Sequence, residues 1–148
     1  MTATSHAVTG ILIATVVKQP ALALPLAFFS HFVIDMIPHW VHKFNRHFYT
    51  QLSVFFDFGL ATLLTVVLVA GSNRPAWILI SAAFLGVIPD AMWMAELWRP
   101  VDFSRKGKTL WSRVQWFCHK IQWSETQLGI IVEIAWCLAT IALIASKN

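Results

Sequence analysis

The chain has 148 residues, of which 57% are hydrophobic and 12% are charged, with eight Trp and eleven Phe. Soluble domains usually carry about 25% charged residues, so a soluble fold of this composition would leave a large apolar surface uncovered. The composition argues against an ordinary soluble domain and predicts an integral membrane protein. The net charge of +4 does not indicate nucleic-acid binding, because most Lys and Arg residues lie in short segments between apolar runs.

Cysteine usage and the start of the chain add two further expectations. Cys118 and Cys137 form no CxxC pair, which argues against a structural disulfide or a cysteine metal site. No Lys or Arg precedes the first apolar run, so we do not expect a cleaved signal peptide.

Five apolar segments follow one another along the chain. The first, residues 7–17, is short, and Thr4 or Ser5 is the expected cap of a helix that begins near His6. Since a bilayer crossing needs about 20 apolar residues, this segment either spans together with its flanks or forms a half-helix. The other four segments are residues 21–37, 51–70, 76–98 and 127–145. We expect an all-α fold, an integral membrane helix bundle of four to five transmembrane segments, as a single multi-pass domain over residues 1–148.

Two connections, at residues 40–50 and 99–125, are basic and rich in aromatic residues. They carry eight of the eleven Lys and Arg residues. With five crossings both lie on the side of the N-terminus, so the positive-inside rule predicts a cytoplasmic N-terminus. We therefore expect a multi-pass protein of the cell membrane, or of the inner membrane if the protein is bacterial.

The connection at residues 99–125 alternates Trp with Lys and Arg. This mixture is typical of a segment at the membrane interface that contacts anionic lipid headgroups. The alternative is a lid over a polar pocket, with His119 reaching inward.

Residues 31–39, HFVIDMIPH, place two imidazoles and a carboxylate at the end of an apolar segment. His31, Asp35 and His39 are four residues apart, so in a helix they lie along one slowly drifting face. Ionisable groups in a membrane helix indicate a functional site, because they are costly next to hydrocarbon. The stretch is therefore the first candidate for a site.

On the expected topology, seven ionisable residues fall in the same half of the bilayer. They are His6, His31, Asp35, His39, Asp57, Asp90 and Glu133. Several such groups at one depth on different helices favour convergence on one polar pocket. His nitrogen and carboxylate oxygen are ligands of zinc and other divalent ions, and a cation would offset the repulsion between the carboxylates. Each residue also has a simpler explanation, as a buried hydrogen-bonded pair, an interfacial side chain or a helix-packing partner.

Three short motifs resemble known families. The early His, the acidic Pro-containing end of the second segment and residues 85–90, LGVIPD, resemble the small membrane-bound metal-dependent hydrolases. His31-x3-Asp35-x2-Pro38-His39 resembles the metal-binding helix of zinc-dependent phospholipases C and single-strand-specific zinc nucleases. The resemblance implies a divalent metal cofactor, with zinc expected. Its implied ligands are His6, His31, Asp35, His39 and Asp90.

Together, the pocket and the resemblance favour a metal-dependent membrane hydrolase that acts on a phosphoester, in a lipid or lipid-linked molecule. Asp57 or Glu133 would serve as catalytic base, and Lys43, Arg46 and His119 would bind the substrate. Membrane lipids and their anionic headgroups are the expected partners, with no nucleic acid, and a homo-oligomer stays open. Two other classes stay open as well: a non-enzymatic ion- or proton-handling protein, and a structural or assembly protein whose His and Asp residues only specify helix packing.

Overall fold

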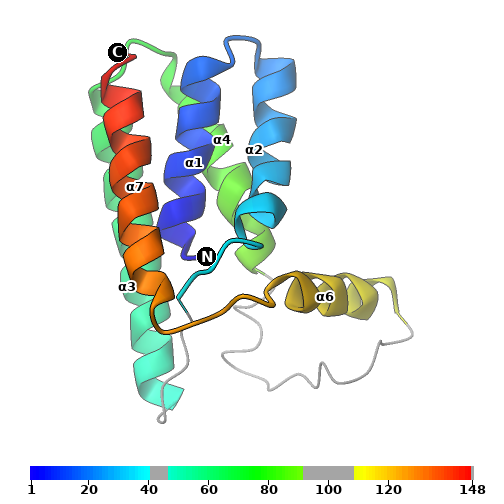
Figure 1. Ribbon diagram of the computed structural model, residues 1–148. Coiled ribbons are helices and arrows are strands. Elements are labelled where there is room, and N and C mark those ends of the chain that lie inside the picture. The colour runs from blue at the N-terminus through cyan, green and yellow to red at the C-terminus, as the bar shows by residue number, and fades with distance from the viewer. Residues whose placement is uncertain (41–46, 92–108, 148) are drawn as a thin grey trace.

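The computed structural model describes residues 1–40, 47–91 and 109–147, without the side chains of His47, Trp111, Gln115 and His119. Within these ranges the chain forms six α-helices and one 3-10 helix, and no strand (Figure 1). They are α1 (Ala3–Val16), α2 (Pro20–Ile34), α3 (His47–Ala70), α4 (Ala76–Val87), η1 (Ile88–Asp90), α6 (Leu110–Ile121) and α7 (Gly129–Ala145). The expected all-α fold is confirmed for the described part of the chain.

Helix α1 is the centre of the bundle. It packs against α2, α3, α4 and α7, which run alongside it in Figure 1. Eleven of its fourteen residues are buried, on every side of the helix. Many of them are small (Ala, Ser, Thr and Gly), so the neighbouring helices approach closely from all directions. The short first segment is therefore the core helix of the bundle.

Two glycines allow α1 and α4 to meet backbone to backbone. A Cβ atom at Gly10 would collide with the backbone carbonyl of Ala82, and one at Gly86 would lie 2.7 Å from the carbonyl oxygen of His6. A side chain at either position would push the helices apart, since backbone atoms cannot move aside as flexible side chains do. The close approach places His6 directly beside the end of α4.

The start of α1 differs from the sequence expectation. The helix begins at Ala3, and Thr2 is its N-cap, with the Thr2 hydroxyl accepting a hydrogen bond from the Ser5 amide at 3.3 Å. The expectation of a cap at Thr4 or Ser5 and a start near His6 was wrong. The reason is that Thr2 satisfies the free amides of the first turn one step earlier in the chain.

The end of α2 also differs. The helix ends at Ile34 with Asp35 as C-cap, so His39 lies beyond it. The expectation that His31, Asp35 and His39 share one helical face was wrong for His39. Pro38 explains this, because a proline disfavours helical conformation in the residue before it and supplies no backbone N–H.

One described helix is long and apolar enough to cross a membrane by length and composition. It is the segment Phe48–Ala70 of α3, with 23 residues and a mean hydropathy of 2.2. The other apolar helices of the described residues are shorter, between 10 and 17 residues. Four to five crossings therefore remain a prediction.

Helix α6 lies across the end of the bundle at which α1 begins (Figure 1). The composition of this region predicts a connection, but the described part of it contains a helix with Thr109 as its N-cap. The chain after α6 is bound to the chain after α2: the Thr126 amide donates to the His39 carbonyl at 2.8 Å, and the Ser124 hydroxyl donates to the Met36 carbonyl at 3.2 Å. These bonds hold α6 at the polar end of the bundle.

Candidate metal centre

Four ionisable side chains meet where α1 begins. His6 comes from the first turns of α1, His31 from the last turn of α2, Asp35 from the C-cap of α2 and Asp90 from η1. The Nε2 atoms of His6 and His31 lie 3.1 and 3.2 Å from the two carboxylate oxygens of Asp35. The same two atoms lie 3.9 and 3.7 Å from the carboxylate oxygens of Asp90. Three helical elements, α1, α2 and η1, thus build one cluster.

The orientation of His31 is set by the backbone of α4. Its Nδ1 atom lies 2.8 Å from the carbonyl oxygen of Gly86. A carbonyl only accepts hydrogen bonds, so Nδ1 carries a proton in this contact, and Nε2 is the ring nitrogen that faces the cluster. Metal-binding histidines in proteins usually have this arrangement, in which a carbonyl or carboxylate orients the ring from behind.

The His6 side chain lies in a buried environment that favours binding of a ligand. Its side chain is 0% exposed, and neither ring nitrogen has a hydrogen-bond partner among the described residues. Nε2 is close to Asp35, but the approach does not have hydrogen-bond geometry. A buried nitrogen without a partner costs free energy, of the order of 1–3 kcal/mol. An ion bound at Nε2 would remove that cost.

His6, His31 and Asp90 form a group that can hold a metal ion. One ligand atom from each residue lies within 4.8 Å of the others. Two imidazole nitrogens and a carboxylate oxygen form a common donor set for zinc and for other divalent transition metals. The residues therefore fit the divalent cofactor expected from the sequence, while the geometry does not select zinc among such ions.

Asp35 connects this group to its surroundings. Besides the two imidazoles, its carboxylate contacts the backbone nitrogen of Met1 and accepts a hydrogen bond from Gln122 Nε2 at 3.3 Å. The side chain is almost completely buried. Because both oxygens are engaged, Asp35 holds the two rings in place and ties the cluster to the segment that follows α6.

Asp57 and Glu133 have different partners. Asp57 accepts hydrogen bonds from the amides of Ala3 at 2.6 Å and Thr4 at 3.1 Å. Glu133 accepts them from the amides of Thr2 at 3.0 Å and Trp40 at 2.7 Å. Amides in the first turn of a helix have no intrahelical partner, and negative charge is favourable there. The two carboxylates expected as catalytic bases therefore cap α1, and this capping places His6.

Of the remaining candidates, the structure describes the side chain of His39, which lies apart from the cluster. His39 is buried, but its Nδ1 donates to the carbonyl of Ile37 at 2.8 Å, and the residue is not part of the group around His6. Lys43 and Arg46 lie outside the described residues, as does the side chain of His119. The substrate-binding expectation for these three residues remains a prediction.

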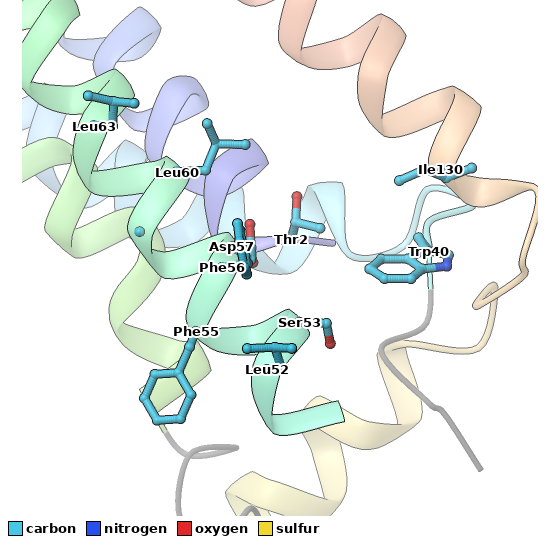
Figure 2. A pocket seen from close by; sticks show the side chains of 11 residues that line it. Thr2, Trp40, Leu52, Ser53, Phe55, Phe56, Asp57, Leu60, Leu63 and Ile130 are labelled. Atoms are coloured by element: carbon cyan, nitrogen blue, oxygen red, sulfur yellow. The ribbon is translucent and has the colours of Figure 1, made fainter. Parts of the chain in front are cut away.

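A groove of about 780 Å³ lies beside the start of α1 (Figure 2). Its lining is mostly apolar and comes mainly from α3, with Ile130 of α7 and Trp40 on the facing side. Thr2 and Asp57 are among its few polar residues, and none of the cluster residues lines it. The groove and the cluster thus flank the first turn of α1 from different sides.

Two residues of this site were not among the predicted site residues. Gly86 contributes a carbonyl oxygen and Gln122 a neutral amide, and neither residue type stands out in an apolar chain with a polar connection. The exception is the missing Cβ of Gly86, since a glycine in an apolar helix is a recognised sign of close approach.

No protein-family model, curated protein or solved structure matches the chain. Over the described residues, the fold and the site define an all-helical protein with one candidate membrane-spanning helix and a largely buried His/Asp group that can hold a metal ion.

Proposed function

We propose that this protein is a multi-pass membrane hydrolase that uses a divalent metal ion, with zinc expected, to cleave a phosphoester in a lipid or lipid-linked molecule. His6, His31 and Asp90 would hold the ion, and the Asp35 carboxylate lies beside the same two imidazole nitrogens. The observation that carries the proposal is the fully buried His6 ring, which lies beside a second imidazole and two carboxylates and whose nitrogens have no hydrogen-bond partner in the described part of the chain.

The membrane part of the proposal is supported by the outer faces of the helices. Large apolar side chains are exposed at helical spacing on each helix that surrounds α1, which is the reverse of a soluble bundle. These side chains include Leu22, Leu26, Phe29 and Val33 of α2, Trp77, Ile80 and Phe84 of α4, and Ile131, Ile134 and Leu138 of α7. Hydrocarbon would cover these stripes, so we place the whole bundle in the bilayer. The excess of Lys and Arg then places the N-terminus and the cluster on the cytoplasmic side.

The hydrolytic part is supported by the composition of the cluster. Three protein ligands are typical of catalytic zinc sites, which keep one position for water or substrate. A divalent ion in such a site polarises a phosphoryl oxygen and activates water. Asp90 is the most exposed member of the cluster, so substrate would enter from its side.

The decisive test is the metal content of the full-length protein, purified in detergent. We expect about one divalent ion per chain, with its loss in His6→Ala and Asp90→Asn. His39→Ala is the matched control, because this buried imidazole lies outside the group. Wild-type protein without stoichiometric metal would overturn the proposal. If metal is bound, phosphodiester and phosphomonoester lipids then test hydrolysis, with His6→Ala expected to be inactive.

One observation favours a second candidate, a purely structural network. Asp35 has His6, His31, Met1 and Gln122 as neighbours without any ion. Buried polar networks of this kind specify a unique packing in some proteins. This candidate predicts no bound metal and no phosphoesterase activity, and it predicts that His6→Leu with Asp35→Leu retains the helical fold.

A further inference from the structure

Helix α6 has an exposed apolar stripe that no described part of the protein covers. Leu110, Val114, Phe117 and Ile121 follow the spacing of one helical face. The first three are exposed, and Leu110 has 80% of its surface accessible. An apolar stripe of this length on a short helix outside a core needs a partner.

The neighbouring faces of α6 show how the stripe is oriented. Cys118, on one side of it, is only 4% exposed. Arg113 and Lys120 lie on the other side, and the Lys120 ammonium lies 4.9 Å from the centre of the Trp116 ring. The apolar stripe is therefore bordered by a buried edge and by a basic edge.

The exposed apolar surface continues beyond α6. Trp123 is 72% exposed and Leu128 is 75% exposed in the segment that leads to α7. Ile131 and Ile134 then continue it along α7. In Figure 1 the axes of the bundle helices are aligned, and α6 lies across them at one end of the bundle. If the bundle spans a membrane, the surface of that membrane therefore runs along α6.

We infer that α6 lies in the plane of an anionic bilayer surface, with the Leu110–Val114–Phe117 face in the upper acyl region and Arg113 and Lys120 at the lipid phosphates. The inference rests on the membrane part of the proposed function. A basic amphipathic helix with bulky apolar residues binds lipid in this way, because apolar burial and charge attraction act together. The charge of the two basic residues selects the anionic lipid surface over a second copy of this basic chain.

This position of α6 places the candidate metal centre at the depth of the lipid headgroups. Gln122 follows the last residue of α6 and donates to Asp35 at 3.3 Å. Ser124 and Thr126 bind the end of the α2 segment within the next few residues. A phosphoester in the headgroup layer would therefore lie at the level of the cluster.

The test uses the full-length protein in vesicles of phosphatidylcholine with phosphatidylglycerol. A cysteine-free background carries one fluorescent label at Val114→Cys, at Ser112→Cys on the opposite face, or at Val66→Cys on the exposed side of α3. Quenching by shallow spin-labelled lipid and by aqueous iodide is measured at each site. We expect the label at residue 114 to be quenched several-fold more by shallow lipid than by iodide, with the reverse at residue 112.

The label at residue 66 of α3 distinguishes a failure of this inference from a failure of the proposed function. A lipid-quenched label at residue 66 together with an iodide-quenched label at residue 114 would overturn the inference and leave the membrane protein intact. Iodide quenching at all three positions would overturn both. A label at residue 114 that neither reagent reaches would also overturn the inference, since it indicates contact with a second copy.

A separate measurement tests whether Arg113 and Lys120 bind anionic lipid. Arg113→Gln with Lys120→Gln should remove the difference in lipid quenching at residue 114 between vesicles with and without phosphatidylglycerol. The label at residue 66 should not change. Equal lipid quenching in both vesicle types for the unmutated helix would contradict the role of anionic lipid.

Discussion

The imidazole rings of His6 and His31 stack on each other, with centroids 3.8 Å apart and an angle of 19° between the ring planes. The two residues are on different helices, and Gly86 on a third helix contacts both: its carbonyl binds His31 Nδ1, and its missing Cβ makes room for the His6 backbone. This contact is the geometric basis of the candidate metal centre. Four predictions follow from it and from its surroundings.

Gly86→Ala should weaken both the fold and the metal site. The new Cβ would lie 2.7 Å from the His6 carbonyl oxygen, so α1 would have to move away from α4. Overpacking of this kind costs about 1–3 kcal/mol, and the shift would separate the ligand atoms. Thermal unfolding in detergent and zinc titration measure the two effects.

Gly59→Ala is the matched control for this substitution. A Cβ at Gly59 meets no atom within 4 Å. Replacing glycine by alanine inside a helix usually stabilises by about 0.5–1 kcal/mol. Similar unfolding temperatures for the two variants would show that α1 and α4 are not in close contact at Gly86.

Asp57→Ala should destabilise the protein by about 1–2 kcal/mol, because it removes the acceptor for two amides at the start of α1. Thr62→Ala on the same helix removes a hydroxyl bonded only to its own helix and should have little effect. Hydrogen exchange of the α1 amides, together with thermal unfolding, measures the change. A loss of activity with no change in either quantity would instead indicate that Asp57 is the catalytic base.

Added metal should stabilise the wild-type protein. A ligand that binds only the folded state adds about 2.7 kcal/mol when its free concentration is one hundred times Kd. Chelation should reverse the rise in unfolding temperature, and His6→Ala should abolish it. An equal rise in His6→Ala would locate the binding elsewhere on the chain.

Cys118 should react slowly with alkylating reagents at neutral pH. Burial, together with the nearby carboxylates of Asp35 and Asp90, raises the pKa of the Cys118 thiol to about 11. The reactive thiolate is a small fraction below that value, so the rate should rise about tenfold per pH unit up to pH 10.

The measurement for Cys118 uses a Cys137→Ser background. The same protein unfolded in dodecyl sulfate is the control, in which the rate should level off near the pKa of an ordinary thiol, about 8.5. A folded-state rate that levels off at the same pH would show that Cys118 is solvated and that α6 does not pack on the bundle there.

Much of the fold was predictable because the apolar runs are long and the polar breaks between them are sharp. The segments expected at residues 51–70 and 127–145 correspond to α3 and α7 within a few residues. The helix α6 was missed although Leu110, Val114, Phe117 and Ile121 have helical spacing. The Trp and basic residues of this region were interpreted from composition alone. Composition indicates a membrane interface but does not indicate a secondary structure.

The His31–Asp35 pair follows from the sequence alone, because a single helical turn brings residues four apart together whatever surrounds them. The sequence also determined that the ionisable residues gather at one end, since each lies at the corresponding end of its apolar segment. Which of these residues meet depends on how the helices pack. His6 and Asp90 join the pair, the His39 ring binds the backbone carbonyl of Ile37, and Asp57 and Glu133 cap α1. The physical reason is that these contacts depend on how far each helix is rotated and shifted against α1. That arrangement is set by small residues and glycines, which carry almost no signal of their own.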